Sequence, residues 1–129
     1  MRAIDTNVLV RFLANDHKQQ SARARAIVEG GQISVSTTVF LEAEWVLRSG
    51  YEFDVARICS AFEGFAGLPG VTVEDPDLLA LAIAMAQSGL DFADALHLGR
   101  AQGCEAFVTF DRRLVKAAKG LGLVEVELA

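Results

Sequence analysis

Short apolar runs alternate with longer amphipathic stretches along this chain, and this alternation is the feature that most constrains its fold. The runs are three to five residues long and mostly apolar. Largely apolar short strands are typical of sheets whose two faces are both covered by helices. The pattern therefore predicts an α/β sandwich with a mostly parallel sheet.

The expected boundaries follow from the glycines, prolines and N-cap residues between the runs. Strands are expected over 2–4, 33–35, 71–73, 106–110 and 124–126. Helices are expected over 6–14, 17–29, 37–48, 54–65, 77–87, 92–102 and 112–119. The chain has no internal repeat and no linker, so the sequence predicts one domain over residues 1–129.

Four acids are placed where a shared pocket can form. Asp5 and Asp111 each follow a predicted strand, and sites in open parallel sheets form at the carboxyl ends of strands. Glu42 and Asp94 lie on predicted helices between them. A cluster of carboxylates with few nearby cations is costly unless a hard divalent cation neutralises it. The four acids are therefore candidate metal ligands.

A simpler interpretation exists for three of these acids. Asp5 and Asp111 stand at strand-to-helix junctions, where aspartate commonly caps the helix that follows. Asp91 is the expected N-cap of helix 92–102, which places Asp94 in the first turn, where the helix dipole favours an acid. The other residues of that helix are nearly all apolar, so we expect Asp94 to be buried. Burial favours a ligand over a surface cap.

Glu42 has no such simple interpretation. On a helix its near neighbours include Val39 and Trp45, and none of them is cationic. A glutamate in a largely apolar stripe needs a partner or a function. Glu44, in contrast, has Arg48 four residues later and is expected to form an ordinary surface ion pair. The sequence therefore favours Glu42 over Glu44 as a site residue.

Three polar residues accompany the acids: Thr6, Asn7 and Thr109. Thr109 stands two residues before Asp111, so both side chains project to the same side of a strand. Its hydroxyl is expected either to bind that carboxylate or a metal-bound water, or to be an ordinary satisfied strand threonine.

Composition and net charge restrict the kinds of partner that this chain is expected to bind. The hydrophobic fraction is 52%, yet no apolar run reaches the about 18 residues of a membrane span. An acid at position 5 with no apolar region after it argues against a signal peptide, so we expect an unprocessed, cytoplasmic protein. The surplus apolar surface favours a subunit or partner interface. A net charge of −5 argues against direct DNA binding but not against a nuclease that gathers acids around cations.

Four segments of the chain resemble those of PIN-domain ribonucleases, and more closely those of the VapC-type toxins of bacterial toxin–antitoxin pairs. The matching segments are DTNVLV at 5–10, LEAEWVLR at 41–48, DFADALHL at 91–98 and TFD at 109–111. Any one of these motifs is weak. Four of them in the same order and spacing, over nearly the whole chain, are specific.

The resemblance implies a Rossmann-like three-layer sandwich with a five-stranded parallel sheet. It implies an endoribonuclease whose pocket holds Mg²⁺ or Mn²⁺ between Asp5, Glu42, Asp94 and Asp111. We expect Asp5 and Asp94 as the primary ligands, with Glu42 and Asp111 binding metal or its waters or accepting a proton from the attacking water. The resemblance further implies a homodimer and a small antitoxin that blocks the pocket, with DNA reached only through that antitoxin.

Two other functions fit part of the sequence. A haloacid-dehalogenase-like phosphatase also uses an aspartate after its first strand, but it needs a second aspartate two residues later, where this chain has Asn7. A non-catalytic subunit acting with its antitoxin on a promoter is distinguished by testing for metal-dependent cleavage. RNA contact would fall to basic residues that rim the pocket, although a solvated helix charge is the simpler interpretation of each: Arg11, Arg48, Arg112, Arg113 and Lys116.

Overall fold

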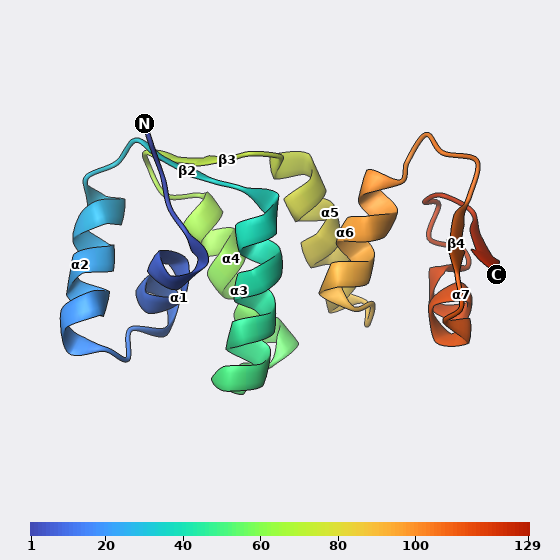
Figure 1. The fold of residues 1–129 in the computed structure, drawn as a ribbon, viewed down its shortest axis with the longest axis horizontal. Coiled ribbons are helices and arrows are strands. Elements are labelled where there is room, and N and C mark those ends of the chain that lie inside the picture. Colours follow the sequence, from blue (N-terminus) through green and yellow to red (C-terminus); the bar gives the residue numbers. More distant parts are fainter. The chain divides into compact units, whose positions relative to one another are not determined.

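Helices and short parallel strands alternate along the chain, as the sequence predicts (Figure 1). The computed structural model describes residues 1–129 and contains seven helices and five strands. They fall into two compact units, Met1–Pro76 and Asp77–Ala129, which we call the first and the second unit. None of the helices combines the length and the apolar character needed to span a bilayer.

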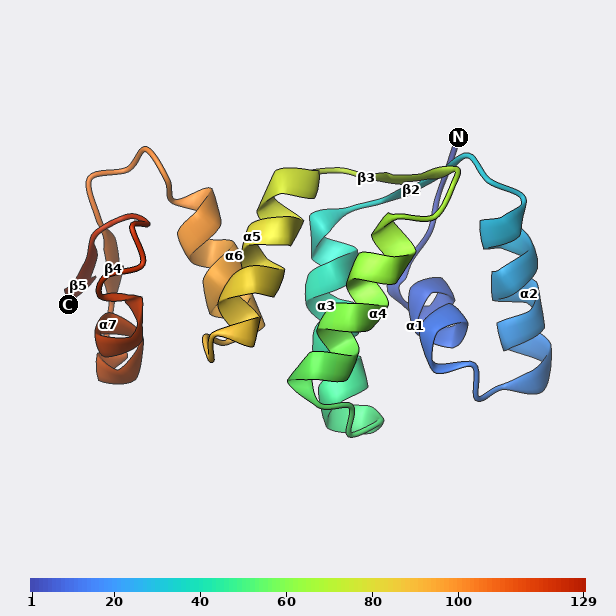
Figure 2. The same cartoon turned by 180° about the vertical axis from the view of Figure 1, so that it is seen from behind.

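The first unit contains β1 (Arg2–Ala3), α1 (Thr6–Ala14), α2 (Lys18–Glu29), β2 (Ile33–Val35), α3 (Thr37–Gly50), α4 (Val55–Ala66) and β3 (Val71–Val73). Its strands form a parallel sheet in the order β1-β2-β3. Helix α1 packs against both α2 and α3, and α3 packs against α4. The same neighbours are seen from behind in Figure 2.

Aromatic packing dominates the core of the first unit. Phe40 of α3 meets Phe62 of α4 edge-on, with ring centroids 5.1 Å apart, and Phe12 of α1 meets Phe65 at 5.5 Å. Three of these rings, Phe40, Phe62 and Phe65, are fully buried. Edge-to-face pairs add a directional contribution to the burial of so much apolar area. The core thus fixes α1, which carries Asp5 at its start, against α3, which carries Glu42.

A close backbone approach joins β2 and β3. Gly31 and Gly70 both have positive φ, 73° and 82°, and Ile33 donates its N–H to the Gly70 carbonyl at 2.9 Å. A Cβ atom at position 70 would lie 2.7 Å from the Gly31 Cα. Only glycine fits this point, because it lacks that Cβ and tolerates left-handed backbone.

The second unit contains all but the first residue of α5 (Pro76–Gln87), and α6 (Phe92–Arg100), β4 (Phe107–Thr109), α7 (Arg112–Ala118) and β5 (Val126–Leu128). Helix α6 lies so close to α5 that a Cβ at Gly99 would overlap the side chain of Leu78. Strands β4 and β5 pair in parallel, with Phe107 opposite Val126 and Thr109 opposite Leu128.

Most predicted boundaries hold to within two residues, and the α/β alternation is confirmed. The last strand is wrong as predicted: it begins at Val126 rather than ending there, because pairing with β4 sets its register. All five strands pair in parallel as predicted, but hydrogen bonds join them as a group of three and a group of two. The single domain over 1–129 stays a prediction.

Candidate active site

Asp5 links the first strand to the first helix. The buried Ile4 precedes it, and its own backbone is extended, with φ −94° and ψ 178°. Its Oδ1 accepts a hydrogen bond from the Val8 N–H at 3.0 Å, which makes it the N-cap of α1. The expected cap is thus confirmed. The cap uses one carboxylate oxygen, and the exposed second oxygen remains able to bind a cation.

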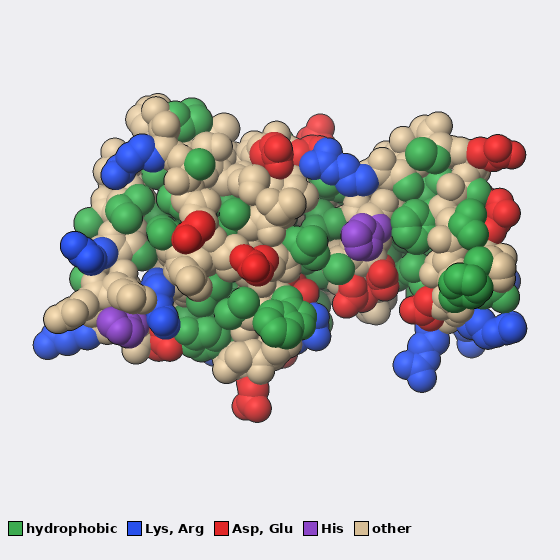
Figure 3. All heavy atoms as spheres, in the orientation of Figure 1, with side chains coloured by type: hydrophobic (Ala, Val, Ile, Leu, Met, Phe, Trp, Pro, Cys, Tyr) green, Lys and Arg blue, Asp and Glu red, His purple; other side chains and the backbone are tan.

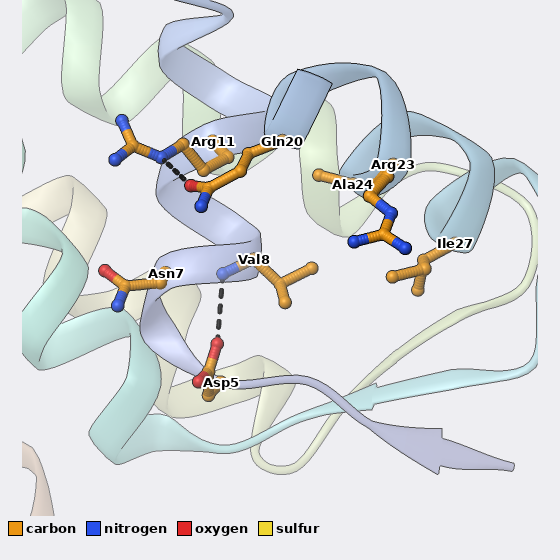
Figure 4. A pocket seen from close by; sticks show the side chains of 8 residues that line it. All are labelled: Asp5, Asn7, Val8, Arg11, Gln20, Arg23, Ala24 and Ile27. Carbon is orange, nitrogen blue, oxygen red and sulfur yellow. Dashed lines mark hydrogen bonds between the residues drawn. The ribbon is translucent and has the colours of Figure 1, made fainter. Parts of the chain in front are cut away.

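A hollow of about 270 Å³ opens beside Asp5, between α1 and α2 (Figure 4). Three of its lining side chains are apolar and five are polar or charged. The lining residues are Asp5, Asn7, Val8, Arg11, Gln20, Arg23, Ala24 and Ile27. Of the polar residues that the sequence pairs with Asp5, Asn7 thus faces this hollow, whereas Thr6 is buried in the first turn of α1.

Arg11 holds one wall of the hollow in place. Its Nε donates to Gln20 Oε1 at 2.7 Å, and its Nη1 donates to the Tyr51 hydroxyl at 2.9 Å and approaches Asp16 at 3.4 Å. Burial is the main cause that raises the pKa of Tyr51. Arg11 is therefore half-buried and engaged, so its interpretation as a solvated helix charge is wrong.

Helix α3 reverses the predicted burial of its two glutamates. Glu44 is buried, with 6% of its surface exposed, and accepts a hydrogen bond from Arg48 Nε at 2.8 Å. Glu42 is exposed and makes no hydrogen bond or ion pair. The ion pair predicted for Glu44 is confirmed, but its surface location is wrong, because Phe40, Ala43, Glu44 and Leu47 form the face that packs inward.

The exposed position of Glu42 leaves it available to a ligand. It shares the outer face of α3 with Trp45, which is 60% exposed. Of the apolar neighbours that the sequence gives Glu42, Trp45 is exposed, whereas Val39 is only partly exposed. On the face of the first unit seen in Figure 3, acidic side chains lie singly among hydrophobic atoms.

In the second unit, Asp91 caps α6 and Asp94 occupies its first turn, as predicted. Asp91 Oδ1 accepts from the Asp94 N–H at 3.0 Å. Asp94 is half-buried rather than buried. Burial raises the pKa of Asp94, the charges of Asp91 and Asp111 raise it further, and His97 opposes them.

Asp111 caps α7 through one carboxylate oxygen, as Asp5 caps α1. Its Oδ1 accepts from the N–H groups of Arg113 at 2.9 Å and Leu114 at 3.3 Å. The Thr109 hydroxyl accepts from the Asp111 N–H at 3.0 Å and so fixes the backbone that carries the acid. Thr109 was expected either to bind the carboxylate or a metal-bound water, or to be an ordinary satisfied strand threonine. The hydrogen bond present is of the second kind. Asp94 and Asp111 lie near enough to influence each other electrostatically.

Neither unit alone brings together three side chains of a metal-binding type. The first unit carries Asp5 and Glu42, and the second carries Asp94 and Asp111. The donor set nevertheless fits a hard cation: it consists of carboxylates alone, two of them with one oxygen outside any cap. The pocket shared by all four acids stays a prediction.

Three features of this region were not predicted from the sequence. His17 is the N-cap of α2, with Nδ1 accepting from the Gln20 N–H at 3.1 Å, and no periodic signal marks it. Glu44 is the buried acid of α3. Arg23 lines the hollow, and its helical spacing from Gln20 and Ile27 is the signal that could have found it.

Comparison with known proteins gives one positive finding. A search of curated proteins found no match. The family model of the PIN domain matches residues 3–120, which takes in parts of both units and all four acids. The match agrees with the observed order of helices and short parallel strands. This chain therefore belongs to the PIN domain family.

Proposed function

We propose that this protein is a Mg²⁺-dependent endoribonuclease that acts as the toxin of a toxin–antitoxin pair. PIN domains are generally nucleases, and the family match over residues 3–120 is the observation that carries the proposal. The geometry of the individual acids supports it. Asp5 and Asp111 end strand segments, and each keeps an oxygen outside its helix cap.

The four acids are proposed to hold the cation, with Asp5 and Asp94 as primary ligands and Glu42 and Asp111 completing the set. When bound, such a cation lowers the pKa of a coordinated water and stabilises charge on the phosphoryl oxygens. The chain supplies the positioning: Val8 N–H holds Asp5, and Thr109 holds the backbone of Asp111. The unpaired carboxylate of Glu42 is free to bind the cation or to accept a proton from water.

Cleavage by the purified protein tests the proposal. The Asp5→Asn variant keeps a side-chain oxygen for the Val8 N–H, so it should fold like the parent while losing the charge. We expect RNA cleavage by the parent in Mg²⁺, none in excess EDTA, and none by Asp5→Asn. Equal cleavage by Asp5→Asn, with matching circular dichroism, would show that the site assignment is wrong.

The toxin role adds partners to the nuclease. We propose a homodimer, and the exposed Trp45 on the outer face of α3 supports an interface, because large exposed apolar side chains mark such surfaces. An antitoxin that occupies the pocket would bring the complex to DNA, since a net charge of −5 disfavours direct binding. Mapping 5′ ends of cellular RNA after expression of parent and Asp5→Asn identifies the substrate. Identical maps would leave only the non-catalytic role in the complex.

A further inference from the structure

Arg23 is a cation of the first unit that lines the hollow and has no counterpart. Among the arginines near the hollow, Arg11 is paired with Asp16, and Arg25 donates to Asn15 at 2.6 Å. Arg23 of α2 lines the hollow, yet it makes no hydrogen bond and no ion pair. In a chain of net charge −5, an unpaired guanidinium is a local site where a polyanion is favoured.

The helical register of α2 directs Arg23 into the hollow. Gln20, Arg23, Ala24 and Ile27 recur at three- and four-residue spacing and so share one face of the helix. Figure 4 shows the Arg23 side chain extending from α2 toward this space. Ala24 is small and buried, which leaves room beneath the longer side chains. Arg25, two residues further on, does not line the hollow.

The lining suits a sugar–phosphate backbone. Val8 and Ile27 offer apolar surface for a ribose ring, and the amides of Asn7 and Gln20 offer hydrogen bonds. A guanidinium binds phosphate oxygens in a bidentate manner. The volume, about 270 Å³, lies near the roughly 300 Å³ at which ligand pockets begin, enough for one backbone unit rather than a whole base stack.

We infer that this hollow binds the RNA backbone next to the scissile phosphodiester, with Arg23 contacting a phosphate. The inference rests on the proposed nuclease function, because Asp5 lines the same hollow. Asp5 repels an anion until a cation neutralises it, so binding in the hollow depends on divalent ions. Contacts of this kind address the backbone, so the contribution of Arg23 is independent of base sequence.

Fluorescence anisotropy with labelled single-stranded RNA tests the inference. All variants are made in a Glu42→Gln background, which keeps the RNA intact. We expect Arg23→Gln to weaken binding on the order of tenfold, the loss for a hydrogen bond to a charged group. The slope of log affinity against log salt should fall by about 0.7, the value for one phosphate contact on a single strand. Arg23→Lys should recover part of the affinity.

The matched control is Arg25→Gln, which removes the same charge from the same helix outside the hollow. We expect less than a twofold change for it. Equal losses in Arg23→Gln and Arg25→Gln would overturn the inference, since general electrostatics would then explain both. No RNA binding by the Glu42→Gln protein, or losses that differ between two unrelated RNA sequences, would also overturn it. Cleavage by the parent protein is scored separately, so failure of the nuclease proposal is recognised independently.

Discussion

The Glu44 carboxylate accepts a hydrogen bond from Arg48 Nε at 2.8 Å on the buried side of α3, one helical turn apart. Arg48 itself is 46% exposed in its side chain, whereas that of Glu44 is 8% exposed. The pair therefore compensates a charge that water reaches poorly. Glu42, two residues earlier, has the opposite setting.

Variants that affect Glu44 should change the stability of the protein, whereas variants of Glu42 should change its activity. Arg48→Ala leaves the Glu44 carboxylate without its partner, and we expect a loss of about 1–3 kcal/mol in the free energy of unfolding. Glu42→Gln should leave stability unchanged and abolish RNA cleavage. Urea unfolding and a cleavage assay on both variants check this. Full activity in Glu42→Gln would remove Glu42 from the site.

The stability of the second unit should depend on the protonation of Asp94. Because the pKa of Asp94 is raised in the fold, the folded state binds this proton more tightly than the unfolded chain. Ionised Asp94 therefore destabilises the folded protein. This loss of stability is absent below the unfolded pKa of about 3.9 and complete above the folded pKa. In EDTA, Asp94→Asn should match the parent at low pH and be more stable at pH 7.

Asp77→Asn is the control for this pH dependence. Asp77 lies in the first turn of α5, where an acid favours the helix. Its replacement should give no gain in stability as the pH rises. A gain equal to that of Asp94→Asn would mean that loss of any acid from this unit has the same effect.

A bound divalent cation should offset the loss of stability that the charge of Asp94 causes. Mg²⁺ at a hundredfold excess over its dissociation constant should stabilise the parent by about 2.7 kcal/mol, because it binds only the folded state. The gain should disappear in Asp5→Asn and Asp94→Asn and persist in Asp77→Asn. Thermal unfolding with and without Mg²⁺ measures it. An equal gain in all four proteins would indicate unspecific ion binding.

Two glycines should respond to alanine in opposite directions. Gly70→Ala places a Cβ 2.7 Å from Gly31 Cα at a φ of 82°, and we expect a loss of roughly 1–3 kcal/mol. Gly64 lies inside α4 with nothing within 4 Å of its Cβ position. Gly64→Ala should stabilise the protein by up to about 1 kcal/mol. The same sign for both variants in denaturant unfolding would contradict the packing described here.

Local signals suffice for most helix starts, because the capping residue and the first turn lie within four residues of each other. Asp5, Asp91 and Asp111 cap helices as their positions predict. The last strand depended on a distant partner instead. The sequence predicts the strand over 124–126, but pairing begins at Val126, opposite Phe107, after Gly120 and Gly122 bend the chain.

The burial of Glu42 and Glu44 could not be predicted for a different reason. Helix α3 carries two apolar stripes, one through Phe40 and Leu47 and one through Trp45, and either can face a core. The face of α3 that turns toward the core is decided by the rings of α4, above all Phe62, which packs against Phe40. Likewise the hollow beside Asp5 arises only when α1 and α2 come together, so the spacing that places Arg23 on one face with Gln20 and Ile27 does not by itself show that this face lines a hollow.

Main-chain N–H groups, rather than neighbouring side chains, hold the carboxylates of Asp5 and Asp111. Every residue except proline supplies such a group. The residues that follow in α1 and α7 can therefore diverge freely over evolution without re-aiming either acid. The fold keeps these two charged groups in place while the surface around them remains open to change.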